Sequence, residues 1–371
     1  MTSARGPVYL TVRARTDLGR TRDHNEDAFL VADLSARTTD LTHGGPHRVG
    51  QRGTVFLVAD GMGGAAAGEL ASSMAADLIF RHLIQTTAAT ESSNPEEFAL
   101  QLRSAVEAAN ARIHRYSKEH PDVRGMGTTA TVAGVLGDTL YLAQVGDSRA
   151  YLVRAGVATQ ITKDQSLMQR LVDAGELTEE EAEQSERRNI ILQALGPDAK
   201  IRVDLTWQEV RRGDTLVICS DGLSGQIKRE EIGALLQQEG DLDKLCDQLI
   251  AIANERGGPD NITVVLVRFE GDGLRFPSDS GEVGYRTLPN DEPDSDEILS
   301  VAKPPAAEPV PAAPPPPPPV PAEPEPPAAE LVAEPPPLPP APARSGSPVT
   351  MAVVTGGLLL LLVVLYFLLR R

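Results

Sequence analysis

Four aspartates stand where short apolar runs of this chain end or begin. Asp60 closes VFLVAD, Asp147 closes LYLAQVGD, Asp221 closes TLVICSD, and Asp260 precedes NITVVLVRF. Two further acids, Glu26 and Asp27, stand side by side in RDHNEDAF. Runs this rich in Val, Ile and Leu are typical of buried strands. Because a sheet can bring the ends of several strands to one edge, we expect these carboxylates to lie close together.

Carboxylates gathered at one edge of a sheet would repel one another and raise one another's pKa, and a bound cation removes that cost. Ligands that are all oxygen favour Mg²⁺ or Mn²⁺ over zinc, and no Cys/His cluster competes for the role. A single Asp-Gly pair is more often a simple turn. Four acidic strand ends together favour a metal site, where two ions sharing Asp60 would make a water nucleophilic near neutral pH.

A glycine-rich turn follows Asp60. Gly61, Gly63 and Gly64 would let the backbone approach a ligand, and the Gly61 carbonyl is a further candidate metal ligand. Arg22 lies just before the Glu26-Asp27 pair, where a guanidinium could bind a phosphate dianion through two hydrogen bonds. Arginines are more often ordinary surface residues, but this position favours the phosphate role.

The composition limits which elements can position these groups. The chain has 371 residues, and its net charge of -17 argues against a general nucleic-acid binder. Its two cysteines lack zinc-type spacing, so we expect no disulfide framework and a reducing compartment. The N-terminus has no apolar stretch typical of a signal peptide.

Strands and helices are separable within the first 270 residues. Six β-rich segments bounded by Gly, Asp or Asn are predicted to be strands: VFLVAD, TATVAGVLG, TLYLAQVG, SRAYLVRAG, DTLVICSDG and NITVVLVRFE. Residues 68–85 and 95–120 have the composition and spacing of helices, with Asn94 as the cap of the second and Pro95 in its first turn. The order predicts an α+β fold: a central antiparallel β-sandwich flanked by helices on both faces.

The sequence changes character after residue 270. Residues 271–348 are acidic and then proline-rich, and are predicted to be a disordered linker; its proline-rich part favours a semi-rigid stalk over a ligand for a proline-binding module. Residues 349–369 carry no charge and are predicted to form one transmembrane helix rather than a core helix. The arginines at 344, 370 and 371 would weakly place the C-terminus inside. The lack of an export signal outweighs this, and we expect an inner-membrane tail anchor with the folded part in the cytoplasm.

Six motifs occur in the order found in metal-dependent type 2C protein serine/threonine phosphatases of the bacterial kind: RDHNEDAF, VADGMGG, GMGTTATVA, VGDSRAYL, CSDGL and DNITVVLV. The resemblance spans residues 8–270, which we take as the catalytic domain. It implies a β-sandwich flanked by helices, with a binuclear Mn²⁺/Mg²⁺ site at one edge. Residues 171–196 resemble the flap of bacterial members, a helical excursion beside the active site.

The resemblance also implies the metal ligands. Asp60 resembles the carboxylate that bridges both ions, and Asp221 and Asp260 resemble further ligands of one of them. The Gly61 carbonyl, with the Glu26-Asp27 pair acting largely through water, resembles the surroundings of the other. Asp147 resembles a ligand of a weaker third ion.

The catalytic roles implied by the resemblance fall on Asp60 and Arg22. Arg22 matches the phosphate-binding arginine, and a water activated by the ions would attack phosphorus in line. The chain departs from the family pattern at two positions. Met62 stands where some members carry a histidine that protonates the leaving group, and Gln165 stands where histidine is common. Neither side chain can titrate as histidine does.

Residues around the flap and the first motif carry weaker signals. Thr178 and Glu181 have the spacing of a capping box, which predicts a helix. Arg187 and Arg188 could contact phosphopeptides, although exposed arginine pairs are common. His24 is interpreted as a supporting or surface residue.

The function expected from this reading is hydrolysis of phosphoserine and phosphothreonine in proteins by a monomeric catalytic domain. The expected partners are phosphorylated proteins, a membrane-bound Ser/Thr kinase and the membrane itself. Two alternatives remain: a phosphatase restricted to one phosphoprotein, and a non-catalytic scaffold that binds phosphoproteins. The scaffold would be expected to have lost metal carboxylates, which are all present here.

Overall fold

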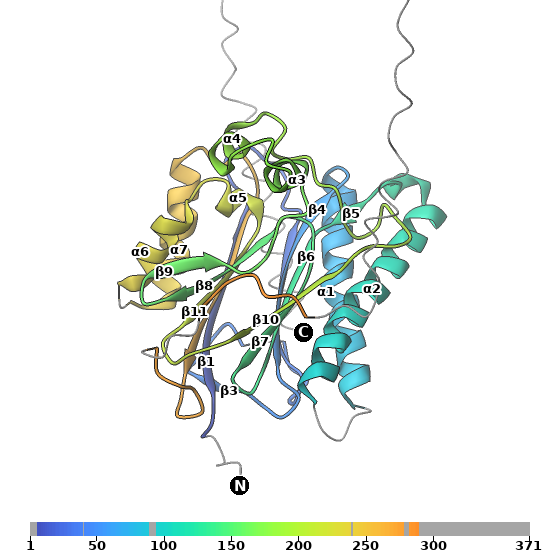
Figure 1. Ribbon diagram of the computed structural model, residues 1–371. Helices are drawn as coiled ribbons and strands as arrows, with labels where there is room; N and C mark the ends of the chain where they lie inside the picture. Colours follow the sequence, from blue (N-terminus) through green and yellow to red (C-terminus); the bar gives the residue numbers. More distant parts are fainter. Residues whose placement is uncertain (1–5, 40, 89–93, 239, 278–281, 289–371) are drawn as a thin grey trace, which may run out of the picture. The chain divides into compact units, whose positions relative to one another are not determined.

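Two antiparallel sheets form the centre of the domain, with helices on both outer faces (Figure 1). The computed structural model describes residues 6–39, 41–88, 94–238, 240–277 and 282–288. Sheet A has the order β3-β1-β12-β11-β8-β9 and sheet B the order β10-β7-β6-β4-β2, with β5 paired to β4. The predicted sandwich of antiparallel sheets and flanking helices is confirmed.

The strands are β1 (Tyr9–Asp17), β2 (Asp27–Asp33), β3 (His47–Arg48), β4 (Thr54–Met62), β5 (Gly127–Thr128), β6 (Ala130–Leu136), β7 (Thr139–Val145), β8 (Arg149–Arg154), β9 (Val157–Gln160), β10 (Asp204–Glu209), β11 (Thr215–Cys219) and β12 (Ile262–Glu270). The helices are α1 (Ala65–Ala88), α2 (Pro95–Glu119), the 3₁₀ turn η1 (Pro121–Val123), α3 (Leu167–Asp173), α4 (Glu179–Gln184), α5 (Asp221–Ser224), α6 (Arg229–Gln237) and α7 (Leu242–Glu255). All six predicted strands are present, and both long helices form.

Alternation along β4 explains the layers. Val55 and Leu57 point to the cluster that includes buried side chains of α1 and α2, whereas Phe56 and Val58 point into the core between the sheets. A strand covered on both faces needs apolar residues at every position, which is why VFLVA is an unbroken apolar run. The outer face of sheet A packs in the same way on α5, α6 and α7. Central strands such as β4 and β11 are therefore buried on both faces, whereas on β1 partly exposed polar residues alternate with buried apolar ones.

Two helix starts behave as the sequence predicts. The Asn94 side chain accepts a hydrogen bond from the Glu96 amide at 3.2 Å, with Pro95 in the first turn of α2. Thr178 and Glu181 form a reciprocal capping box at α4, inside the predicted flap. Each side-chain bond satisfies a backbone N–H that the helix leaves unpaired.

The chain stays against the sandwich beyond residue 270. Leu274 is buried, and Val283 and Leu288 pack against the core clusters. A disordered linker starting at residue 271 therefore does not describe residues 271–277 and 282–288, because Leu274 is buried and Val283 and Leu288 pack against the core. The remainder of the predicted linker after 288 and the predicted transmembrane helix at 349–369 lie outside the described residues. In the part of the chain that is described, no helix combines the length and apolarity needed to cross a membrane.

Candidate metal centre

Asp27 and Asp60 lie opposite each other on neighbouring strands. Antiparallel pairing of β2 with β4 puts them in direct register. Like charges placed in this way destabilise a sheet unless something offsets them. Sequence spacing could not show this pairing, because 32 intervening residues carry no signal of which strand β2 joins.

Two threonines hold the backbone of Asp60. The Asp60 amide donates to Thr129 Oγ1 at 2.9 Å, and the Thr129 amide donates back to the Asp60 carbonyl at 2.9 Å. Thr128 Oγ1 donates to the same carbonyl at 2.9 Å. Both threonines come from the GMGTT motif, so this motif acts by fixing the position of the carboxylate on β4.

Asp221 enters the cluster from the end of β11. It begins α5, and its charge raises the pKa of the nearby Asp60 carboxyl group. The residue before it, Ser220, donates through Oγ to Asp27 Oδ2 at 2.7 Å. The amide of Thr263 on β12 donates to Ser220 Oγ at 3.0 Å. Ser220 therefore joins the strand ends of the two sheets.

Asp260 lies at the start of β12 and holds Arg22. The Arg22 Nη2 atom donates to Asp260 Oδ2 at 2.7 Å, and the Asn261 amide donates to Asp260 Oδ1 at 2.8 Å. About half of the Arg22 side chain is exposed. The arginine thus reaches the carboxylate cluster while part of its guanidinium remains accessible.

Asn261 organises the loop that carries Glu26. Its Nδ2 atom donates to the carbonyls of Leu18 and His24, both at 2.9 Å, and its Oδ1 atom accepts from the Glu26 amide at 2.8 Å. The Glu26 carbonyl in turn accepts from the Gly61 amide at 3.1 Å. The His24 side chain is exposed, which agrees with its interpretation as a surface residue.

Asp147 occupies the turn between β7 and β8 and is only 6% exposed. Because β7 belongs to sheet B and β8 to sheet A, this turn crosses from one sheet to the other. Asp27 and Asp60 come from sheet B, whereas Asp221 and Asp260 adjoin strands of sheet A. The acidic residues therefore line the seam where the two sheets meet at one end of the sandwich.

Burial and mutual repulsion raise the pKa of these carboxyl groups. Burial is the larger cause in each case. For Asp60, burial and then Asp27 and Asp221 hold the pKa well above its ordinary value. Burial raises the pKa of Asp27 to about 7, and burial with the neighbouring Asp221 raises that of Asp147 to about 8. Asp221 is shifted in the same direction by burial and Asp260.

The cluster fits a pair of hard divalent cations. One carboxylate oxygen each of Asp27, Asp147 and Asp221 is buried without a hydrogen-bond partner, and an unpaired buried oxygen is costly unless a ligand meets it. The donors are all oxygen, which suits Mn²⁺ or Mg²⁺. Among the described residues no three acidic, His or Cys side chains already surround one position, so side-chain rotation and water would complete the coordination.

Glycines allow the close packing of this edge. A Cβ on Gly61 would lie 2.6 Å from the Glu26 carbonyl oxygen, so a side chain there would push the Glu26 loop away. Gly63 and Gly64 have φ values of 115° and 93°, in the region that favours glycine. The sequence suggested that these glycines let the backbone approach a ligand. The structure shows that they are also needed for the turn that joins β4 to α1.

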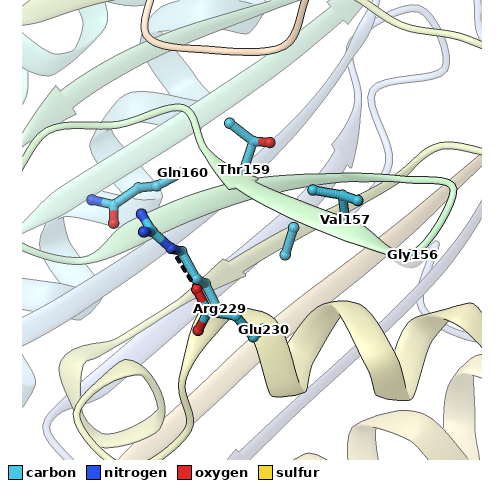
Figure 2. Close-up of a pocket in the computed structure, with 7 residues that line it drawn as sticks. Gly156, Val157, Thr159, Gln160, Arg229 and Glu230 are labelled. Carbon is cyan, nitrogen blue, oxygen red and sulfur yellow. Dashed lines mark hydrogen bonds and ion pairs between the residues drawn. The ribbon is translucent and has the colours of Figure 1, made fainter.

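A groove of about 1160 Å³ opens beside the cluster. Arg22, Asp147, Asp221 and Asp260 line one part of it, and the flap helices α3 and α4 line another. A smaller pocket of about 480 Å³ lies along β9, and Figure 2 shows Arg229 and Glu230 of α6 beside it, joined at 2.9 Å. Both residues also line the groove.

An ion pair spans the groove. Arg229 Nη2 of α6 lies 3.7 Å from a carboxylate oxygen of Glu179, the first residue of the flap helix α4. The flap and α6 thus form two walls of one cleft that has the carboxylates within it. Of the two flap arginines, Arg188 lines the groove, whereas Arg187 is not among its lining residues.

The two departures from the family pattern have different surroundings. Met62 ends β4, pairs with Gly127 and is half-buried. Gln165 exchanges two hydrogen bonds with Gly146: its amide donates to the Gly146 carbonyl at 2.9 Å, and its Oε1 accepts from the Gly146 amide at 3.0 Å. Gln165 therefore supports the turn that carries Asp147, a role that does not require titration.

The supporting residues Thr128, Thr129, Ser220 and Asn261 were not singled out from the sequence. Each lies inside or next to a quoted motif, and this was the signal that could have identified them. The carboxylates and Arg22 were predicted, and the structure brings them together.

Comparison with known proteins agrees with this arrangement. Residues 36–266 match the family model described as protein phosphatase 2C. The serine/threonine phosphatase stp of Listeria monocytogenes is 38% identical over 253 residues, covering 68% of this chain and 93% of that protein.

Solved structures give the same result. The serine/threonine phosphatase of S. agalactiae superposes with a TM-score of 0.62 at 35% identity, covering 70% of this chain and 99% of that one. The catalytic domain of the phosphatase PstP, solved with two manganese ions, superposes with a TM-score of 0.57 at 35% identity, covering 71% and 99%. Matched motifs, fold and clustered carboxylates lead to one conclusion: the chain belongs to the protein phosphatase 2C family of metal-dependent serine/threonine protein phosphatases.

Proposed function

We propose that this chain removes phosphate from phosphoserine and phosphothreonine in proteins, using water activated at the seam between its two sheets. The observation that carries the proposal is the set of buried carboxylates with unpaired oxygens, opening onto a groove that also holds Arg22. A groove of this size accommodates an extended peptide segment as well as the phosphate.

The resemblance to type 2C phosphatases supplies the assignment of metal ligands, and the clustering of the carboxylates supports it. Asp60 would be shared by two ions, with Asp221 and Asp260 on one side and the Gly61 carbonyl on the other. Asp147 would serve a weaker third ion. When bound, Mn²⁺ or Mg²⁺ supplies positive charge that offsets the carboxylates and lowers the pKa of water toward neutrality.

Arg22 would bind the phosphate of the substrate. Its Nη2 atom already hydrogen-bonds Asp260, which fixes the guanidinium beside the cluster, and hydrogen bonding to Asp260 raises its pKa. The remaining N–H groups of the guanidinium match the oxygens of a phosphate dianion. Met62 cannot donate a proton, so water or another group would protonate the leaving alkoxide.

Replacing Arg22 by alanine is expected to lower kcat/KM for a phosphothreonine peptide by about a hundredfold, because a charge-assisted bidentate contact is lost. Arg22→Lys should recover part of the loss, since lysine keeps the positive charge but cannot make the bidentate pair of hydrogen bonds. Steady-state phosphate release by the full chain in Mn²⁺ measures both.

Arg20→Ala is the matched control, because Arg20 is exposed in the same loop and does not line the groove. Wild-type kcat/KM in Arg22→Ala would disprove the phosphate-binding role. A wild-type chain that binds the phosphopeptide and releases no phosphate would point to the scaffold alternative instead.

The proposed partners are phosphoproteins made by a Ser/Thr kinase. The substrate class is supported by relatives named serine/threonine phosphatases. A kinase in the same membrane is suggested by the uncharged segment 349–369. The domain would act as a monomer on the cytoplasmic side of the inner membrane.

Deleting residues 349–371 is expected to move the protein from the membrane fraction to the soluble fraction, because about 20 apolar residues suffice to span a bilayer. Fractionation of cells followed by immunoblotting measures the distribution. Deleting residues 310–332, a stretch of the same length, should leave the protein in the membrane fraction. Membrane association that survives loss of 349–371 would rule out this anchor.

A further inference from the structure

Residues 282–288, here called the strap, lie outside the family match and run along the open edge of sheet B. Thr287 pairs antiparallel with Thr206 of β10. The Trp207 amide donates to the Arg286 carbonyl at 3.0 Å, and the Leu288 amide donates to the Leu205 carbonyl at 2.8 Å. The strap thus covers an edge strand whose unpaired N–H and C=O groups would otherwise face solvent.

Side chains strengthen this pairing. The Arg286 guanidinium lies 5.8 Å from the centre of the Trp207 ring, a cation–π contact. The Gln208 side-chain amide donates to the Gly284 carbonyl. Val283 and Leu288 reach two different core clusters. The strap is therefore packed at both ends and bonded in the middle.

The start of β10 connects the strap to the segment that closes the flap. Leu205, whose carbonyl accepts from the Leu288 amide, directly follows Asp204, the first residue of β10. Asp204 accepts from Arg202 Nε at 3.2 Å, and the Arg202 amide donates to Gln193 Oε1 at 2.7 Å. Ordering of the strap thus fixes the residues that lead from the flap into β10.

Gln165 carries the connection to the site. Its Nε2 atom donates to the Arg202 carbonyl at 3.2 Å, and its other two bonds hold Gly146, the residue before Asp147. Gly146 has a φ of 102°, and a Cβ there would lie 2.6 Å from the Thr129 side chain. Thr129 is the residue that receives the Asp60 amide. The contacts that hold Asp60 and Asp147 in place therefore extend through Gln165 to Arg202.

We propose that the strap is a positioning element of the phosphatase site: by ordering β10 and Arg202 it holds Gln165, and through Gln165 the turn that carries Asp147. Release of the strap would loosen that turn without touching a carboxylate. This inference concerns hydrogen bonds within the fold, so it stands or fails independently of the proposed substrate.

The test uses the full chain with Leu288→Pro, which removes the amide that bonds Leu205. Hydrogen–deuterium exchange reports the local effect. We expect the Gly146 and Gln165 amides to exchange about tenfold faster, along with the β10 amides, while the β1–β12 ladder is unchanged. Leu288→Ala keeps the amide and separates lost packing from lost bonding, so it should have the smaller effect.

Unchanged exchange at Gly146 and Gln165, with loss of protection confined to β10, would overturn the proposal. A uniform rise throughout both sheets would also contradict it, since it would show a general loss of stability. A Gly/Ser replacement of residues 282–288 should reproduce the local pattern. The same replacement at 321–327 is the control and should leave it unchanged.

A double-mutant cycle gives a second readout. Leu288→Pro and Gln165→Ala should each lower kcat/KM by about three- to tenfold, and the pair should be little worse than Gln165→Ala alone, because both changes interrupt one connection. Effects that multiply would show that the strap and Gln165 act independently and would refute the inference.

Discussion

Asp60→Asn is expected to lower kcat for a phosphothreonine peptide by about a thousandfold, corresponding to a loss of about 4 kcal/mol of transition-state stabilisation. Asparagine keeps the size of the side chain but removes the charge that both ions would share. The threonine bonds involve the Asp60 backbone, so they survive the substitution. Phosphate release in saturating Mn²⁺ measures the loss.

The same substitution should stabilise the metal-free protein. Asp60 repels Asp27 and Asp221 in a buried site, so a neutral amide removes an unfavourable interaction. We expect the Tm in EDTA to rise while activity disappears, a combination that a misfolded variant cannot produce. Asp23→Asn, at an exposed position within the first motif, should change neither. Activity within tenfold of wild type would exclude Asp60 as the shared ligand.

Removing metal with EDTA should abolish turnover and make stability depend on pH. Asp27 and Asp147 have pKa values of about 7 and about 8 in the folded chain, above the ordinary aspartate value of 3.8. At pH values between the ordinary aspartate pKa and these raised pKa values, the folded state holds more protons than the unfolded state. The free energy of unfolding therefore falls as pH rises from about 4 to about 8. Thermal unfolding in EDTA across this range measures the fall.

Mn²⁺ should offset the fall in stability with rising pH. Ions compensate the ionised carboxylates, so the Tm increase on adding Mn²⁺ should be larger at pH 8 than at pH 5. The lowered pKa of His82, caused by burial, acts in the opposite direction, but it is a single half-buried group. The lowered pKa of Glu231, about 2 because of Arg256, acts below this window. A metal-free Tm that is constant or rises between pH 5 and pH 8, or turnover that survives EDTA, would contradict the metal centre.

The acidic strand ends were predictable because apolar runs stop abruptly at Asp60, Asp147 and Asp221. Burial on both faces of a central strand favours a continuous apolar run, so an acidic residue at the end of that run stands out in the sequence. The prediction of a metal site followed from residue type together with the repeated position of these acids at the ends of apolar runs. The partners of each carboxylate did not follow, because the β2–β4 register that places Asp27 against Asp60 depends on pairing between distant segments.

Polar support was less visible than the carboxylates. Ser220 and Asn261 act through two or three hydrogen bonds each, made from loops, where neither periodicity nor composition distinguishes a structural hydroxyl or amide from a solvated one. Gln165 looked like a lost histidine, and its role appears only when Gly146 and Arg202 are seen on either side of it. The strap was hidden for a different reason: acidic, Pro- and Gly-containing sequence around it resembles a linker, and its order comes from the free edge of β10.

The position of the acidic residues on the seam has a consequence for the whole domain. Elsewhere between the sheets, apolar side chains such as Phe56 and Ile218 hold the two layers together. At this end residues of like charge face one another across the layers, and hydrogen bonds such as that from Ser220 to Asp27 link the two sheets in place of apolar contacts. Ions bound there would act as crosslinks between sequence positions as distant as Asp60 and Asp221, closing a long loop of chain much as a disulfide does. Metal starvation would then expose this end of the sandwich to proteases at the same time as it stops catalysis, so that the supply of metal sets both the activity and the lifetime of the enzyme.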